Sequence, residues 1–220
     1  MKKFLTLATV VSILAVACTS APDADTAATG EAQAAGAATG TSFSLDSAST
    51  VGFVGTKVGG QHNGTFNITS GSFTVDSGNI TSGTIIIDMK SAVVLDLTGD
   101  DKNNLEGHLK SGDFFMVDSF PAATFEITGS AAFDSTTATS KLAGATHTIN
   151  GNLTLRGQTK SVSFPAIVKV EGNSLSAQAD FNIDRTNWGL SYKGPNNPAD
   201  WFIAKEVNLK LNLKATAVAQ

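Results

Sequence analysis

Residues 175–183 read Leu-Ser-Ala-Gln-Ala-Asp-Phe-Asn-Ile, and this stretch decides the fold. Apolar and polar side chains alternate along it with a period of two, which is typical of a β-strand with one buried and one solvated face. Residues 207–215 repeat the pattern, with Val, Leu, Leu, Leu and Ala separated by Asn and Lys. Both strands are expected to turn their apolar faces to a common interior.

Turn residues separate further strands of the same kind. Glycine-containing turn sequences occur at residues 70–71, 77–79, 156–158 and 171–173. Such sequences favour tight turns, so the pattern predicts eight or nine strands between Val51 and Ala217, most of them in hairpins. Only residues 100–111 are expected to be helical, because Leu105 and Leu109 stand one helical turn apart.

Eight strands of this kind allow two architectures. They can close into an antiparallel barrel or form a two-sheet sandwich, and alternation alone does not choose between them. An eight-stranded barrel is either filled by its own side chains or holds one small ligand.

Residues 1–17 have the features of a cleaved export signal. Two lysines precede an apolar run over residues 4–16, which is too short to span a bilayer about 30 Å thick. Residues 14–18, Leu-Ala-Val-Ala-Cys, resemble the lipobox of bacterial lipoproteins, in which the cysteine, here Cys18, is acylated (for example with palmitate) and becomes the first residue. An ordinary secretory signal is the alternative. Thr19, in place of the aspartate that retains lipoproteins at the inner membrane of enteric bacteria, favours a periplasmic protein anchored to the outer membrane.

The composition excludes two kinds of interaction. Cys18 is the only cysteine of the 220 residues, so the chain cannot form an intramolecular disulfide. Without the first 17 residues, 13 Lys and Arg stand against 19 Asp and Glu, a net charge of −6. Because phosphate binding needs clustered basic side chains, nucleic acid is not expected as a partner.

Residues 18–42 are predicted to be the lipidated cysteine and a disordered tether. After Cys18 they contain no aromatic and no large aliphatic side chain, so they cannot bury enough apolar surface to fold alone. A flexible chain of this length averages about 27 Å end to end. The folded domain is expected to comprise residues 43–220.

Four stretches carry a family resemblance. Residues 107–125 run from Gly-His-Leu-Lys-Ser-Gly-Asp-Phe-Phe to Pro-Ala-Ala-Thr-Phe, residues 149–165 contain Gly-Asn-Leu-Thr-Leu-Arg-Gly, residues 182–190 read Asn-Ile-Asp-Arg-Thr-Asn-Trp-Gly-Leu, and residues 46–53 read Asp-Ser-Ala-Ser-Thr-Val-Gly-Phe. They resemble the YceI-like polyisoprenoid-binding proteins of the bacterial periplasm, over about residues 43–217. The resemblance implies an all-β fold, a lipocalin-like, extended, antiparallel eight-stranded β-barrel with one short helix. It also implies an elongated apolar pocket for an isoprenoid quinone, a prenol or another long-chain lipid. Residues 100–103 and the insertion at 193–199 depart from the family pattern and leave the ligand open.

Large apolar side chains are the candidates for the wall of this pocket. They are Phe53, Phe66, Leu109, Phe114, Phe115, Phe120, Phe125, Leu153, Leu155, Phe164, Phe181 and Trp188. Aromatic rings offer a large apolar area with only two torsions to restrain. Filling the core of the barrel is the alternative role for each of them.

Few polar residues are candidates for a site. Arg185 is either the contact for a ligand headgroup or a structural ion pair or turn anchor at the end of a strand. His62, His108 and His147 lack the short spacing of metal ligands, so neither a metal nor a cofactor is expected.

Three hypotheses for function follow. The first is a lipid-anchored, non-enzymatic carrier that sequesters an isoprenoid or similar lipid. The second is an envelope interaction module with a filled barrel. The third, a hydrolase built on Asp100, Asp101 and Asp184, is disfavoured because the sequence has no catalytic motif. A homodimer is left open.

Overall fold

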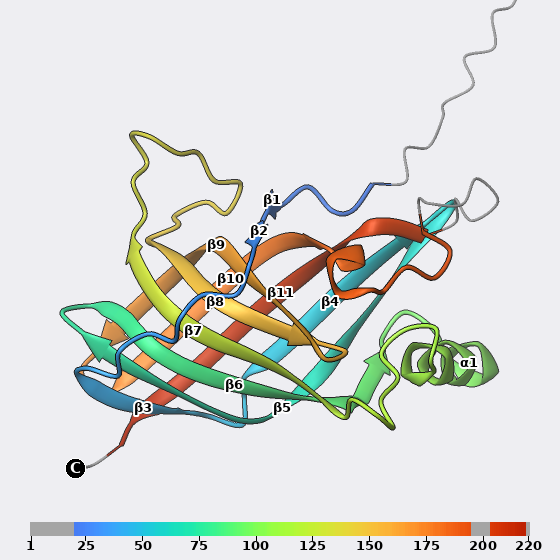
Figure 1. Cartoon of the computed structure of the whole chain (residues 1–220), viewed down its shortest axis with the longest axis horizontal. Helices are drawn as coiled ribbons and strands as arrows, with labels where there is room; N and C mark the ends of the chain where they lie inside the picture. The colour runs from blue at the N-terminus through green and yellow to red at the C-terminus, as the bar shows by residue number, and fades with distance from the viewer. Residues whose placement is uncertain (1–19, 195–202, 219–220) are drawn as a thin grey trace, which may run out of the picture.

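The alternating strands form one β-sheet that returns on itself (Figure 1). The computed structural model describes residues 20–194 and 203–218. The first strands are β1 (Asp25–Thr26), β2 (Ala28–Gly30), β3 (Thr41–Leu45), β4 (Thr50–Lys57), β5 (Gly60–Asp76) and β6 (Asn79–Val94). Helix α1 (Gly99–Lys110) follows, and then β7 (Ala122–Ala132), β8 (His147–Leu155), β9 (Gln158–Glu171) and β10 (Ser174–Asp184). The short 3₁₀-helix η1 (Arg185–Trp188) precedes β11 (Ile203–Ala217).

Pairing between β9 and β10 closes the sheet into a barrel. Strands β4 to β11 pair in sequence order, each antiparallel to the next, and β11 also pairs antiparallel with β4. Strand β3 shares the position of β4, because it also pairs with β11 and β5. The predicted eight-stranded antiparallel barrel with one helix is therefore confirmed, and the sandwich is excluded.

The predicted alternation is seen directly in the register of β10 and β11. Leu175 lies opposite Ala215, and Ile183 lies opposite Val207. The odd-numbered residues of β10 from 175 to 183 are all buried. A shift of one residue would turn this whole face to solvent, so the apolar pattern determines which side of the strand faces inward.

The interior is filled at the end of the barrel that carries β3, at the left of Figure 1. The rings of Phe164 and Phe181 stack with their centroids 3.9 Å apart, and Phe125 lies 5.8 Å from Phe164. A Cβ at Gly151 would lie 2.4 Å from the ring of Phe125, so glycine lets that ring press against the wall. This half of the barrel is a packed core.

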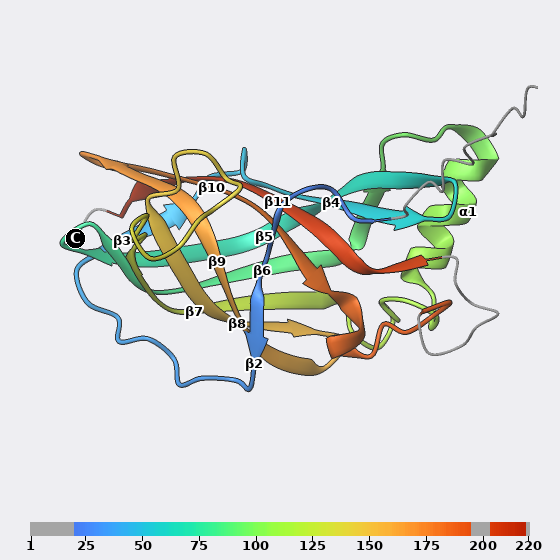
Figure 2. The ribbon, with the colours of Figure 1, turned by 90° about the horizontal axis from the view of Figure 1, so that it is seen from above.

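Helix α1 lies at the opposite end, which we call the α1 end (Figures 1 and 2). It begins and ends within one residue of its predicted limits. Asp100 and Asp101 in its first turn match the positive end of the helix dipole. Glu106 joins the helix to the barrel by accepting a hydrogen bond from the N–H of Val94 (2.9 Å). No helix among the described residues is long and apolar enough to cross a bilayer.

The 3₁₀-helix η1 was not predicted. Its N-terminus is capped by the side chain of Asp184, which accepts from the N–H of Thr186 (3.0 Å). Trp188 is fully buried, and its Nε1 donates to the carbonyl of Leu153 (2.8 Å). This hydrogen bond ties η1 to the wall of the barrel.

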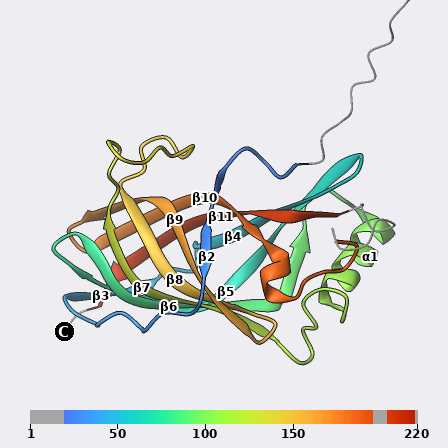
Figure 3. The same ribbon diagram turned by 45° about the horizontal axis from the view of Figure 1, so that its top comes forward.

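The disordered tether predicted for residues 18–42 is wrong for its described part. Residues 21–36, here called the strap, cross the outside of the barrel (Figures 2 and 3). Strand β1 pairs with β10 and β2 pairs with β9. Small side chains allow this close contact: Ala24 and Ala27 are buried, and a Cβ at Gly36 would lie 2.2 Å from the carbonyl oxygen of Thr81. The strap folds by adding strands to an existing sheet, which its lack of large apolar residues does not prevent. Residues 18 and 19 lie outside the described residues.

Two phenylalanine substitutions should separate the filled half from the other half of the barrel. Phe164→Ala should lower the free energy of unfolding by about 3–5 kcal/mol, because the packed neighbours cannot close the void. Phe53→Ala, at a half-buried position toward the α1 end, should cost about half as much, since less apolar surface is lost from burial. Urea unfolding of both variants measures the difference, and equal losses would contradict a barrel filled at one end only.

Candidate functional site

The α1 end of the barrel encloses a cavity of about 360 Å³. Its wall is formed mainly by apolar side chains, which include Val51, Phe53, Phe66, Ile87, Met89, Leu105, Leu109, Phe114, Phe115, Ala123, Leu153, Leu155, Ile183, Leu190, Ile203, Val207 and Leu209. Polar lining comes from Thr56, Lys57, His62, His108, Arg185, Tyr192 and Lys193, and no Asp or Glu is among the described lining residues. The volume lies within the range of about 300–1,000 Å³ that small-molecule pockets have.

Seven of the twelve residues predicted for the pocket wall line this cavity. They are Phe53, Phe66, Leu109, Phe114, Phe115, Leu153 and Leu155. The ring of Phe66 lies 5.3 Å from that of Phe53 and meets Phe115 edge to face at 5.5 Å. Phe115 follows α1, whereas Phe53 and Phe66 come from β4 and β5, so these contacts join the helical segment to the wall opposite it.

The other five lie elsewhere. Phe125, Phe164 and Phe181 belong to the packed half, and Trp188 is held by its hydrogen bond to the barrel wall. Phe120 is half-buried beside Gly157, whose Cβ would lie 2.8 Å from its ring. Alternation shows which side chains point inward, but not at which depth along the barrel they stand.

Three rings in the lining of the cavity contact one another. The ring of His108 lies 5.0 Å from Phe114 and 4.9 Å from Tyr192, and Phe114 lies 5.4 Å from Tyr192. His108 is also 2.9 Å from the carboxylate of Asp113. Sequence analysis missed Tyr192, because nothing in the chain indicates that the segment after η1 returns to meet α1.

A second polar contact stands where β5 meets the segment after β6. Nδ1 of His62 lies 2.7 Å from Asp96, whose other oxygen accepts from the N–H of Asn63 (2.9 Å). Desolvation raises the pKa of Asp96, but the hydrogen bonds from Asn63 and His62 more than offset this, so the pKa lies below its ordinary value. This contact therefore keeps its stabilising effect unless the pH falls below the ordinary range of an aspartate.

The three histidines do not come together. His147 contacts the carbonyl of Gly78 at 3.2 Å, on a different hairpin from His62 and away from the ring cluster of His108. Within the described ranges, no group of three or more His, Cys, Asp or Glu side chains is placed to hold a metal ion.

Arg185 lines the cavity but is held by the backbone. Its guanidinium donates to the carbonyls of Leu190, Tyr192 (3.0 Å), Ile203 (3.2 Å) and Ala204 (3.0 Å). Burial lowers the pKa of Arg185, and the charge of nearby Asp184 opposes that effect. Of the roles considered from sequence, this geometry is that of a turn anchor, since the side chain ties the segment after η1 to the start of β11.

Asp184, considered for a hydrolase, is committed to local structure. One of its oxygens caps η1 and accepts from the hydroxyl of Thr186 (2.6 Å), and the other lies 3.5 Å from Nζ of Lys205. Asp100 and Asp101 stand at the start of α1 and are not among the residues that line the cavity. The cavity therefore has no carboxylate among its described lining residues.

A closed antiparallel barrel with an apolar chamber at one end is the architecture of small β-barrel binding proteins. A family model described as the YceI-like domain matches residues 43–215. The chain belongs to this family, as the sequence resemblance predicts.

Curated relatives match part of the chain. A UPF0312 protein of Pseudomonas paraeruginosa is 38% identical over 112 residues, and one of Yersinia enterocolitica is 35% identical over 112 residues. Each match covers 50% of this chain and 50% of the relative. The chain thus spans about half the length of these relatives.

Solved structures share the fold. The crystal structure of Burkholderia cenocepacia BcnA has a TM-score of 0.61 at 22% identity and covers 78% of this chain and 99% of that one. A polyisoprenoid-binding domain from Saccharophagus degradans, described as implicated in plant cell wall breakdown, has a TM-score of 0.57 at 20% identity, with 81% and 99% covered. At these identities the likeness establishes the barrel.

Substitution of Arg185 should test its anchoring role. Arg185→Met leaves four carbonyl oxygens without their donor, which should lower the free energy of unfolding by about 3 kcal/mol or more. Arg185→Lys should recover only part of the loss, because an ammonium cannot donate along the same fork of directions. Urea unfolding followed by tryptophan fluorescence measures both variants. A loss below about 1 kcal/mol for the methionine variant would show that the carbonyls do not depend on Arg185.

Proposed function

We propose that this protein is a non-enzymatic binding protein that holds the chain of an isoprenoid or similar amphiphilic lipid in the cavity at the α1 end of its barrel. The observation that carries the proposal is the cavity itself, because its lining is mainly apolar and comes both from the barrel strands and from Leu105 and Leu109 of α1. The alternative from sequence, an interaction module with a filled barrel, describes only the half of the interior around Phe164 and Phe181.

Burial of a hydrocarbon chain supplies enough free energy for such binding. Each buried methylene contributes about 0.8 kcal/mol, so a chain segment of about ten carbons gains roughly 8 kcal/mol. Association costs at least about 4 kcal/mol. A pocket without an elaborate polar site can therefore bind at micromolar concentrations or below once the headgroup makes a few contacts.

The comparisons support the same class of ligand. The Saccharophagus degradans domain with this fold is described as polyisoprenoid-binding. The polar groups in the lining of the cavity, which include Lys57, His62 and Tyr192, are the candidates for contacts to a headgroup. An isoprenoid quinone or a prenol has both the apolar chain and the small polar head that this arrangement suits.

Extraction of the purified protein tests the proposal directly. Protein isolated without added lipid should release a long-chain lipid in near-stoichiometric amount into organic solvent, identified by mass spectrometry. The delipidated protein should bind a prenol such as geranylgeraniol. Absence of a bound lipid together with absence of prenol binding would refute the proposal and favour the interaction module.

Filling the cavity should abolish binding without unfolding the barrel. Leu209 points into the cavity, whereas Asn212 on the same strand is exposed on the outside. Leu209→Trp should weaken geranylgeraniol binding by at least about tenfold, a loss of about 1.4 kcal/mol or more, because the indole occupies the space of the chain. Asn212→Trp is the matched control and should bind as the unchanged protein does. Equal binding by both variants would place the ligand elsewhere.

We infer further that the chain is a periplasmic lipoprotein, acylated at Cys18 and anchored to the outer membrane. The support is the lipobox-like sequence at residues 14–18. Cys18→Ser should partition into the soluble fraction, whereas the unchanged protein should remain with membranes and enter the detergent phase of Triton X-114. Purified Cys18→Ser should still bind geranylgeraniol, because the anchor and the cavity are separate. Membrane residence of the serine variant would contradict acylation.

A further inference from the structure

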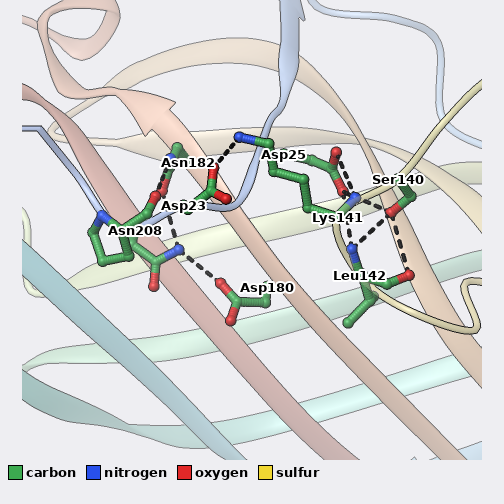
Figure 4. Close-up of polar contacts among 9 residues, drawn as sticks. Asp23, Asp25, Ser140, Lys141, Leu142, Asp180, Asn182 and Asn208 are labelled. Carbon is green, nitrogen blue, oxygen red and sulfur yellow. Dashed lines mark hydrogen bonds and ion pairs between the residues drawn. The ribbon is translucent and has the colours of Figure 1, made fainter.

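Besides the pairing of β1 and β2 and the ion pairs Asp23–Lys141 and Glu31–Lys160, three groups of hydrogen bonds that involve side chains hold the strap to the barrel. In the first, the carboxylate of Asp25 accepts from the hydroxyl of Ser140 (2.6 Å) and from the N–H groups of Lys141 (3.0 Å) and Leu142 (3.4 Å) (Figure 4). These donors lie in the segment between β7 and β8. A carboxylate that satisfies backbone N–H groups fixes the position of the strap where β1 begins.

The other two groups hold the backbone of the strap on either side of β1 and β2. Nδ2 of Asn182 donates to the carbonyl of Pro22 (2.9 Å), and the carbonyl of Asn182 accepts from the N–H of Ala27 (2.8 Å). The side chain of Asn152 accepts from the N–H of Gln33 and donates to its carbonyl, both at 2.8 Å. The strap is therefore seated along its length.

The N-terminal end of the strap lies over β10 and β11. Asn182, which holds Pro22, also accepts from Nδ2 of Asn208 on β11 (3.0 Å) (Figure 4). Asn208 is fully buried although it belongs to the outward-facing set of β11. Cys18 precedes the first described residue, Ser20, by two positions, and two residues reach at most about 7 Å. A lipid on Cys18 would therefore leave the protein close to the outer face of β11.

This face of the barrel carries a balanced set of charges. Strand β11 has Lys205, Lys210 and Lys214 against one acidic residue, Glu206, and β4 has no acidic residue. Lys205 and Lys210 lie 3.5 Å from Asp184 and Asp180 of β10, with 54% and 56% of their side chains exposed. Asp180, Asp184 and Glu206 thus offset the three lysines, so this wall carries no net negative charge that would repel a bilayer surface, although the domain as a whole is acidic.

We propose that the outer wall formed by β11 and β4 rests on the bilayer, so that the barrel lies on its side with α1 at the edge of the contact. The proposal rests on the lipidation of Cys18 proposed above. The seated strap determines how far from the barrel a lipid on Cys18 can lie and on which side of the barrel it lies. The lipid therefore stays near the wall over which the strap ends. Release of the strap would turn it into a flexible tether of the kind expected from sequence.

The single cysteine allows the orientation to be tested without the cell's lipidation machinery. The chain from Cys18 onward is coupled to vesicles of phosphatidylcholine and phosphatidylglycerol that contain a maleimide lipid. Lysines are then acylated with an amine reagent and quantified by mass spectrometry. Lys210 and Lys214 should react several-fold more slowly on vesicles than in solution, whereas Lys90 on β6 and Lys110 on α1 should react at the same rate.

A variant with a released strap supplies the decisive comparison. Asp25→Ala combined with Asn182→Ala removes the side-chain hydrogen bonds that hold the N-terminal end of the strap, those to Ser140 and to Pro22. This variant should stay on the vesicles but lose the protection of Lys210 and Lys214. Asp23→Ala is the matched control, because Asp23 is 87% exposed and pairs with the side chain of Lys141; it should keep the protection.

Should the double variant unfold, Lys210→Gln with Lys214→Gln provides a second test, since both side chains are exposed. Protection of Lys205 should then fall on vesicles. Uniform protection of all lysines, protection centred on Lys110, or protection that survives release of the strap would each overturn the proposal. Because the lipid is attached chemically, these outcomes do not depend on whether Cys18 is acylated in the cell.

Discussion

The short pairing between β9 and β10 is the constraint on which the rest of the molecule depends. These two strands pair only over Ser174–Gln178 of β10 and Ile167–Glu171 of β9. Beyond this contact, β1 pairs with Phe181 and Asn182 of β10, and β2 pairs with residues 161–163 of β9. A closed sheet has no exposed edges, and here the N-terminal segment completes the part of the closure that the barrel strands leave open. The cavity and the packed core both depend on this closure.

Packing within the barrel explains why one half is hollow. Near the α1 end, a Cβ at Gly64 would lie 2.6 Å from the ring of Phe53, so the glycine lets the ring lie against the wall. Gly151 does the same for Phe125 in the other half, but there the stacked rings of Phe164 and Phe181 occupy the centre. The same kind of contact between a glycine and a ring therefore occurs in both halves of the barrel. The other inward-pointing side chains determine whether the centre of each half is filled.

Much of the fold follows from the periodicity of apolar residues, and there are physical reasons why this periodicity does not predict the rest. The period of two in β10 and β11 determines which side chains point inward, and the closing of eight such strands was one of two predicted architectures. Depth along the barrel has no periodic signal, which is why Phe181 could be assigned to the interior but not to its filled half. Tyr192 lines the cavity from a segment that Arg185 holds by donating hydrogen bonds to its carbonyls, and such contacts are set by tertiary structure. The strap escaped prediction for a related reason: its stability comes from hydrogen bonds to Asn152 and Asn182 and from alanines in close contact, neither of which gives an apolar pattern.

The seated strap also has a consequence for the order in which the protein forms. A polypeptide is made from its N-terminus, yet the partners of Asp25 and Pro22 stand 115 and 160 positions further along the chain. The strap therefore cannot be fully seated until β10 is present, and its complete seating belongs to the last stage of folding. Before the strap is seated, a long flexible segment would separate an N-terminal anchor from the folded part of the chain, and after seating this separation would be short. Completion of the barrel would thus bring an anchored domain close to the membrane, so a short distance between domain and membrane would indicate a completely folded protein.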